Sequence, residues 1–442
     1  MKYIKRKILF ISTASTVVLV GLIGLLVILS STTSIKDSID LEGAEFKPNP
    51  DYQVVNKQLV ITNDEERFYI NQQIIPDPIR VPVNTQLNVE VQNKTSYAIS
   101  LHFHGVLGMN KMDGVGNITQ ESIKPQESFT YQFNLDRVGT YMYHSHVDSL
   151  NQVNNAFLFG GLVVEDEIMQ AATNKEMLMI NTQNDDNTIY INNQEHLEYL
   201  LNNNEDIYLN IVNISSSPIT LYFGEDIEWE ILNLDANATT SQVYQNQELY
   251  LPTANRIDVK IKNPHKSFVL YTTLDDTYNA EVGFKITKNL DYTSEKAKYF
   301  TDISDLEGFK HQKLLYLYDI VTSKESVKEQ EPDKEFNLEL GMNHMQWTIN
   351  NEAYPNNTTL DVDEGDIITI NLVSNSSNSP HPFHLHGHEF SVIKVNDQKV
   401  NKSLLLDTVE VLPDEKVTIQ FTANNPGIWA FHCHDLEHAA RG

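Results

Sequence analysis

Residues 367–387 read IITINLVSNSSNSPHPFHLHG, and this stretch contains the pattern that decides the fold. Apolar and polar residues alternate from Ile367 to Leu372, a polar turn follows, and a second apolar segment ends at Gly387. Alternation begins again at Lys416 and continues to Phe421. Period-two alternation between short turns is typical of half-buried antiparallel strands. The stretch therefore predicts a β-sheet structure.

The same succession of strands occurs three times along the chain. Each copy has an alternating strand, a strand that ends at a glycine, and a second alternating strand, at residues 87–91, 101–105 and 128–133, then 207–212, 221–224 and 256–261, then 367–372, 383–387 and 416–421. Many such strands at short spacing predict β-sandwiches, and three sandwiches of roughly 110 residues each would fill the chain. The charged stretch Ser323 to Glu335 has no apolar periodicity and is interpreted as part of a linker. The predicted divisions are residues 1–30, an anchor or signal; 31–51, a stalk; 52–170, 171–290 and 336–442, the three domains; and 291–335, a linker.

Histidine spacing supplies the functional signal. Residues i and i+2 of a strand point to the same face, so His-x-His on a strand directs two imidazoles to one place. Fifteen histidines placed at random would give roughly 0.5 such pairs, and the chain has five. They are His102/His104, His144/His146, His384/His386, His386/His388 and His432/His434. In the second copy Leu221 and Phe223 occupy the matching positions, so the middle domain is expected to act as a spacer without these ligands. Imidazole binds copper, zinc, iron and nickel, so the pattern predicts metal binding without naming the metal.

Cys433, the single cysteine, narrows the choice of metal. The segment from His432 to His438 places a thiolate and a second imidazole five residues apart, and His381 is the natural third ligand from a distant strand. A trigonal His₂Cys set is typical of blue copper. Because His432 and His434 flank the cysteine, they can reach a different metal cluster and provide a short covalent path for electrons.

These motifs resemble those of the three-domain multicopper oxidases, the family of laccases and bacterial copper-resistance oxidases. The resemblance is carried by His102-Phe103-His104-Gly105, His144-Ser145-His146, the segment His381 to His386, and His432-Cys433-His434 with His438, and it covers about residues 55 to 442. It implies three cupredoxin-like Greek-key β-sandwich domains in an all-β chain; the transmembrane anchor before them is predicted separately, from the N-terminal residues. It also implies four coppers per chain, one of type 1, one of type 2 and two of type 3.

The resemblance further implies a role for each ligand. The type 1 copper takes His381, Cys433 and His438; the type 2 copper takes His102 and His384; and the type 3 pair takes His104, His144, His146, His386, His432 and His434. The first and third domains each give four of the eight trinuclear ligands, so that cluster is expected at their interface. Asp113 matches an acid that the family carries near the type 2 site and is a candidate proton relay, although an Asp-Gly pair also forms turns. Ala439 stands where related bacterial laccases often have a second acid.

The implied activity couples four one-electron oxidations of a donor to reduction of O₂ to water. Phenols, aromatic amines, Mn(II) and Fe(II) remain open as donors. Cu(I) is disfavoured because there is no methionine-rich insert, although Met342 and Met345 flank His344 in a pattern that suits soft copper(I). The alternative is a cell-surface copper-binding or electron-transfer protein without turnover, which would not need the eight cluster histidines. A dizinc hydrolase is a weaker alternative, since it leaves Cys433 unexplained.

The N-terminus predicts a membrane location. Lys2, Lys5, Arg6 and Lys7 precede a run of 22 uncharged residues, Ile8 to Leu29, which is long enough to cross a bilayer. Basic residues before the run and acidic ones after it place the N-terminus in the cytoplasm and the domains outside. An uncleaved anchor is favoured over a signal peptide; cleavage near Ser31 would give a secreted protein. The 60 acidic residues against 32 basic ones disfavour a nucleic-acid partner. We expect a monomer.

The C-terminus carries one further expectation. In the family the axial position of the type 1 copper falls ten residues after the cysteine, and this sequence stops at Gly442. A closing strand would normally follow and cover the sheet edge. The sequence is therefore expected to be a fragment whose natural chain continues with Met, or less often Leu or Phe, and a short apolar strand.

Overall fold

The computed structural model describes residues 46–182, 188–201, 205–274, 277–286, 313–322, 329–356, 359–376 and 379–442. The predicted anchor and most of the predicted stalk and linker lie outside these residues. None of the helices in the described part of the chain is long and apolar enough to cross a membrane.

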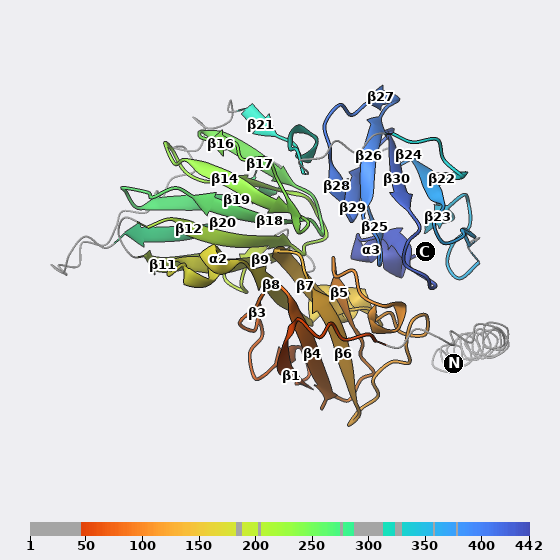
Figure 1. Ribbon diagram of the computed structural model, residues 1–442, viewed down its shortest axis with the longest axis horizontal. Helices are drawn as coiled ribbons and strands as arrows, with labels where there is room; N and C mark the ends of the chain where they lie inside the picture. The colour runs from red at the N-terminus through yellow and green to blue at the C-terminus, as the bar shows by residue number, and fades with distance from the viewer. Residues whose placement is uncertain are drawn as a thin grey trace, which may run out of the picture. The chain divides into compact units, whose positions relative to one another are not determined.

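The described chain is built from six β-sheets that occur in pairs along the sequence (Figure 1). The first pair has the strand orders β2-β1-β4-β6 and β3-β8-β7-β5. Its strands are β1 (Gln53–Asn63), β2 (Phe68–Ile70), β3 (Ile79–Pro82), β4 (Thr85–Asn93), β5 (Leu101–His104), β6 (Ser128–Leu135), β7 (Gly139–Ser145) and β8 (Phe159–Glu165). Three short helices accompany them, η1 (Asn110–Met112), η2 (Leu150–Asn155) and α2 (Glu167–Ala171).

The second pair has the strand orders β10-β9-β12-β18-β14-β15, with β16 beside β14, and β11-β20-β19-β13-β17-β21. Its strands are β9 (Lys175–Thr182), β10 (Ile189–Ile191), β11 (His196–Leu201), β12 (Ile207–Asn213), β13 (Ile219–Tyr222), β14 (Trp229–Leu234), β15 (Asn237–Ala238), β16 (Val243–Tyr244), β17 (Gln247–Leu251), β18 (Arg256–Ile261), β19 (Phe268–Leu274), β20 (Thr277–Ile286) and β21 (Lys313–Leu315). The 3-10 turn η4 (Leu317–Asp319) follows β21.

The third pair has the strand orders β23-β22-β24-β30-β26-β27, with β28 beside β26, and β29-β25-β31. Its strands are β22 (Lys334–Asn343), β23 (Gln346–Ile349), β24 (Ile367–Ser374), β25 (His381–Leu385), β26 (Phe390–Val395), β27 (Gln398–Lys399), β28 (Leu405–Leu406), β29 (Thr408–Val411), β30 (Lys416–Thr422) and β31 (Phe431–Cys433). The helix α3 (Leu436–Ala440) follows β31. We call the three pairs the first, second and third sandwich.

The strands predicted from alternation are present. Residues 87–91, 207–212 and 367–372 lie in β4, β12 and β24, and residues 128–133, 256–261 and 416–421 lie in β6, β18 and β30. In each sandwich the first of these strands lies beside the second in antiparallel register and beside an earlier strand in parallel register. The prediction of an all-β fold is therefore confirmed.

The cores follow from the apolar positions of these strands. In the first sandwich, Ile61 and Leu87 of one sheet pack with Leu101 and Leu162 of the other, and all four are fully buried. A separate cluster that contains Met142, Phe159, Met177 and Tyr208 joins β7 and β8 to strands of the second sandwich. Burial of apolar side chains stabilises a fold by roughly 25 cal/mol per Å², so these contacts fix the strand ends that carry the histidines.

Candidate metal centre

Four strands bring the predicted histidines together. In the first sandwich β5 pairs with β7 so that His102 lies opposite His144. In the third sandwich β25 pairs with β31 so that His384 lies opposite His432. Because each of these strands also carries a neighbouring histidine two residues away or just beyond its end, the two sandwiches each direct four imidazoles to a common region.

The imidazoles from the two sandwiches meet directly. The Nε2 atoms of His102 and His384 lie 3.4 Å apart, and those of His144 and His434 lie 3.3 Å apart. His432 Nε2 lies 3.3 Å from His146 Nε2 and 3.0 Å from His386 Nε2. His104 stacks on His384 with 3.7 Å between ring centroids. The eight histidines thus lie close together, at the contact between the first and third sandwiches.

The chemistry of this cluster fits bound metal ions. Burial, reinforced by the neighbouring imidazoles, holds the pKa of His144, His146 and His434 well below the usual histidine range. Burial likewise lowers the pKa of His432 to about 3. The rings are therefore neutral at physiological pH, and a neutral ring nitrogen has a free electron pair for a metal.

His104 has its Nδ1 atom, and not its Nε2 atom, free to bind a metal ion. His104 Nε2 contacts Asp407 Oδ1 at 3.1 Å and Thr408 Oγ1 at 3.2 Å, whereas its Nδ1 is buried without a partner. A buried ring nitrogen without a hydrogen bond is costly. A metal ion bound at His104 Nδ1 would remove that cost.

A second cluster forms around the thiol. Cys433 Sγ lies 3.4 Å from His438 Nδ1 and 3.8 Å from His381 Nδ1. Burial raises the pKa of Cys433 well above its usual value and lowers the pKa of His381 to about 4 and of His438 to about 3. A soft thiol with two neutral imidazoles is the donor set of a blue copper site, and metal binding displaces the thiol proton.

Local structure positions the second imidazole. Asp435 is the residue just before the helix α3, and its side chain accepts hydrogen bonds from the backbone N–H groups of Glu437 and His438. This N-cap fixes the first turn that carries His438. Trp347 of β23 packs on the His438 ring with 3.8 Å between centroids, and Ser379 Oγ lies 3.0 Å from His438 Nε2. His438 Nδ1 is thereby left facing the thiol.

The two clusters share one strand. Cys433 lies opposite Phe383, while its neighbours His432 and His434 contact histidines of the other cluster. Adjacent residues of a strand point to opposite faces, so His-Cys-His on β31 separates the thiol from the two imidazoles. Only the peptide and side-chain bonds between neighbouring residues separate the clusters along the chain.

Asp113 lies at a turn and also contacts two of the cluster histidines. Its backbone ends η1, and Gly114, which follows, has φ +85° and leaves no room for a Cβ against Leu101 O. Its side chain contacts His386 Nδ1 at 3.0 Å and His102 Nδ1 at 3.2 Å. Burial alone would raise the pKa of Asp113, but the two histidines lower it well below its usual value. A carboxylate therefore lies directly beside the cluster.

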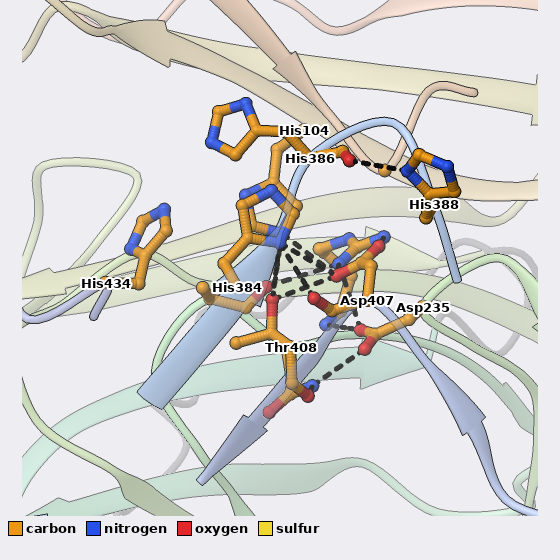
Figure 2. Close-up of polar contacts among 12 residues, drawn as sticks. His104, Asp235, His384, His386, His388, Asp407, Thr408 and His434 are labelled. Carbon is orange, nitrogen blue, oxygen red and sulfur yellow. Dashed lines mark hydrogen bonds and ion pairs between the residues drawn. The ribbon is translucent and has the colours of Figure 1, made fainter. Parts of the chain in front are cut away.

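Sequence reasoning missed Asp407 and Thr408. Thr408 Oγ1 and the backbone oxygen of Asp407 lie 3.1 and 2.9 Å from His384 Nδ1 (Figure 2). His386 and His388 lie beyond the end of β25, so they do not share a strand face as their spacing predicted; His388 is buried and contacts the backbone oxygen of His386 through Nδ1 at 3.2 Å. The only available signal for Asp407 was an acid at the end of an apolar segment, which is too common to indicate a site.

Comparison with known proteins agrees with this geometry. Models of multicopper oxidase sequences match residues 53–169 and 328–442, which together are about half of the chain. The chain is 26% identical to the iron transport multicopper oxidase FET3 of Candida glabrata, across 83% of this chain and 70% of the relative. It is 25% identical to FET3 of Saccharomyces cerevisiae, across 78% of this chain and 65% of the relative. It is also 25% identical to the multicopper oxidase MmcO of Mycobacterium tuberculosis, across 83% and 80%.

Solved structures share the fold. The structure of Fet3p, a multicopper oxidase that functions in iron import, has a TM-score of 0.73 and 22% identity, covering 88% of this chain and 89% of that chain. A Campylobacter jejuni multicopper oxidase has a TM-score of 0.68 and 20% identity, covering 89% and 91%.

Proposed function

Because the chain belongs to the multicopper oxidase family, whose members are copper-dependent oxidoreductases that use O₂, we propose a specific division of its histidines among four coppers. His381, Cys433 and His438 hold the type 1 copper, and His102 and His384 hold the type 2 copper. The type 3 pair is held by His104, His144, His146, His386, His432 and His434. The observation that carries this proposal is β31, where the thiol lies in one cluster and both neighbouring imidazoles lie in the other.

Bound copper would supply the redox chemistry, since each ion can take one electron and four ions match the four electrons that O₂ requires. The residues of the chain hold the ions, orient the imidazole rings and transfer protons. The neutral imidazoles hold the ions without adding charge, and their contacts with Asp113, Asp407 and Thr408 fix the orientation of the rings. Asp113 is the proposed proton relay, because its carboxylate lies beside His102 and His386.

The alternative, a copper-binding protein without turnover, is less well supported. Such a protein needs His381, Cys433 and His438. It has no use for eight further imidazoles gathered from two sandwiches, with Nε2 atoms of the first and third sandwiches 3.3 to 3.4 Å apart in three pairs. A dizinc hydrolase likewise leaves the Cys433 cluster without a role.

A low-valent metal ion is the proposed donor class. The names of the FET3 relatives point to Fe(II). One observation favours Cu(I) as a second candidate: Met342 is 56% exposed and Met345 81% exposed at the turn between β22 and β23. Met342 lies opposite Trp347, which packs on His438. Thioethers bind soft copper(I), so this turn presents two suitable ligands near the type 1 residues.

Oxygen uptake by the copper-loaded chain should be measured with Fe(II), Cu(I), Mn(II), a phenol and an aromatic amine. We expect kcat/KM to be highest for a metal ion. Met342→Leu combined with Met345→Leu should reduce kcat/KM for Cu(I) about tenfold and leave the value for Fe(II) unchanged, because leucine keeps the bulk and loses the sulfur ligand. Faster uptake with phenols than with any metal ion would contradict the proposed donor class. Absence of oxygen uptake with all five donors would contradict the proposed function.

The basic-then-apolar N-terminus supports membrane attachment with the sandwiches on the extracytoplasmic face. Protease added to protoplasts is expected to digest the sandwiches and to leave the first thirty residues in the membrane fraction, because a bilayer shields the apolar run. Immunoblots against tags at either end measure this. Recovery of the protein mainly in the medium, with a new N-terminus near Ser31 or Thr32, would contradict anchoring and favour secretion.

A further inference from the structure

A buried arginine lies where the three sandwiches meet. Arg256 begins β18 of the second sandwich and is fully buried. Its Nη1 and Nη2 donate to Asp407 Oδ1 at 2.8 Å and Oδ2 at 2.7 Å, so the guanidinium holds both oxygens of one carboxylate. Asp235, also in the second sandwich, accepts from the Arg256 backbone N–H and lies 3.1 Å from Nη1. Two carboxylates therefore surround one cation in the interior.

The same side chain touches the first sandwich. Arg256 Nε donates to the backbone oxygen of Thr140 at 3.4 Å, and Nη2 lies so close to Gly105 that a Cβ on that residue would be 2.3 Å away. Gly105 directly follows His104. The guanidinium thus contacts the first sandwich beside one cluster histidine while it holds an aspartate of the third sandwich.

Asp407 extends this arrangement to the histidines (Figure 2). Its Oδ1 lies 3.1 Å from His104 Nε2 and accepts a hydrogen bond from Thr408 Oγ1 at 2.9 Å. Its backbone oxygen lies 2.9 Å from His384 Nδ1. Because Asp407 contacts His104 through Nε2 and His384 through Nδ1, the other ring nitrogens, His104 Nδ1 and His384 Nε2, are left for the cluster. His384 Nε2 lies beside His102 Nε2 there. Asp407 therefore sets which nitrogen each of two histidines offers to the metal.

A contribution to stability does not explain why Arg256, Asp235 and Asp407 are buried together. Burying charged residues costs desolvation energy that their pairing often fails to recover, and apolar replacements can be as stable. A bidentate arginine does fix geometry, because its planar fork allows only one orientation of the carboxylate. The arrangement therefore serves orientation better than it serves stability.

We propose that Arg256 is a positioning residue of the trinuclear cluster: it holds Asp407 so that His104 and His384 present the correct nitrogens. The second sandwich, which contributes no proposed ligand, is then an active part of the site, and not only a spacer. This inference rests on the proposed function, since it assumes that these histidines bind copper.

The test compares Arg256→Lys, Arg256→Gln and Asp407→Asn with the parent chain and with Arg80→Gln. Arg80 of the first sandwich is the control, because it also joins two sandwiches, through Asn210 of the second at 3.0 Å. It pairs with Glu165 of its own sandwich at 2.9 Å and contacts no cluster histidine. Full-length protein is loaded with copper. The readouts are copper per chain, thiolate-to-copper absorbance, and the type 2 electron paramagnetic resonance signal.

We expect the three site variants to lose at least one of the four coppers or to show a changed type 2 signal, while their type 1 absorbance per chain stays as in the parent. The type 1 residues do not contact Arg256 or Asp407, so loss of trinuclear copper or of the type 2 signal alone indicates positioning. Loss of the type 1 absorbance together with the type 2 signal indicates a general structural role and overturns the proposal. Arg256→Lys keeps the charge and loses the fork, so it should resemble Arg256→Gln. Arg80→Gln should resemble the parent.

If Arg256→Gln fails to fold, the result for Asp407→Asn tests the proposal in its place, because asparagine keeps the volume of the aspartate side chain. Four coppers and an unchanged type 2 signal in Asp407→Asn and Arg256→Lys would overturn the proposal. A parent chain that binds no copper would instead overturn the proposed function, so the two failures are distinguishable.

Discussion

Replacement of Cys433 by serine should bleach the protein and reduce donor-driven oxygen uptake to the background of the assay. The thiolate is the only soft ligand in the type 1 set, and its charge transfer to copper is the expected source of the blue colour. Serine keeps the shape of the cysteine side chain but lacks its sulfur, the copper ligand. Since Cys433 also lies on the chain between His432 and His434, its loss interrupts the proposed path of electrons between the two clusters.

The remaining coppers distinguish this result from unfolding. Because Cys433 contacts His381 and His438 and not the cluster of eight histidines, Cys433→Ser should keep about three coppers per chain and the type 2 resonance signal. Ser379→Ala is a useful control, since it removes a contact with the outer nitrogen of His438 and no ligand; it should stay blue. A Cys433→Ser protein that remains blue, or that still consumes oxygen at the parent rate, contradicts the assignment.

Asp113→Asn should lower kcat with O₂ by about 10²- to 10⁴-fold, the usual contribution of a positioned proton-transfer group. The blue colour should persist, because Asp113 contacts His102 and His386 and none of the type 1 residues. Asparagine retains the shape of the side chain at the turn before Gly114 but cannot take up a proton. Stopped-flow reoxidation of the fully reduced protein measures the effect.

A turn control separates proton relay from local folding. Asp414 also lies at a turn, has φ +57° and is exposed, so Asp414→Asn should leave kcat unchanged. If Asp113→Asn lost the copper signals and thermal stability together with activity, Asp113 would be needed for its turn alone. A reoxidation rate equal to that of the parent would exclude it as the relay.

The strands and the histidine clusters were predictable because both depend on short-range patterns. Alternation located β4, β12 and β24, and His-x-His on a strand requires only two residues to agree. The position of Cys433 between two histidines was enough to predict that the thiol lies in one cluster and both histidines lie in the other. The same reasoning treated Asp113 as either a relay or a turn residue, and its backbone and side chain show contacts consistent with both.

Arg256 and Asp407 were not predictable for a physical reason. Alternation in Arg256–Ile261 predicts one apolar face and one solvated face, yet Arg256 and Asp258 are both fully buried, because other parts of the protein cover the polar face. Asp258 accepts from Thr140 of the first sandwich, and Arg256 pairs with Asp407 of the third. Contacts between sandwiches join residues more than a hundred positions apart, and no local pattern encodes them.

The number of donor electrons consumed per O₂ tests the central claim most directly. The copper-loaded chain is mixed with a measured amount of the donor that supports the fastest uptake, in a closed vessel with an oxygen electrode and a peroxide assay. Four-electron reduction predicts four donor electrons for each O₂ consumed and no accumulated peroxide. Two electrons for each O₂, with peroxide in equal amount to the oxygen lost, would contradict a functional trinuclear cluster in this protein.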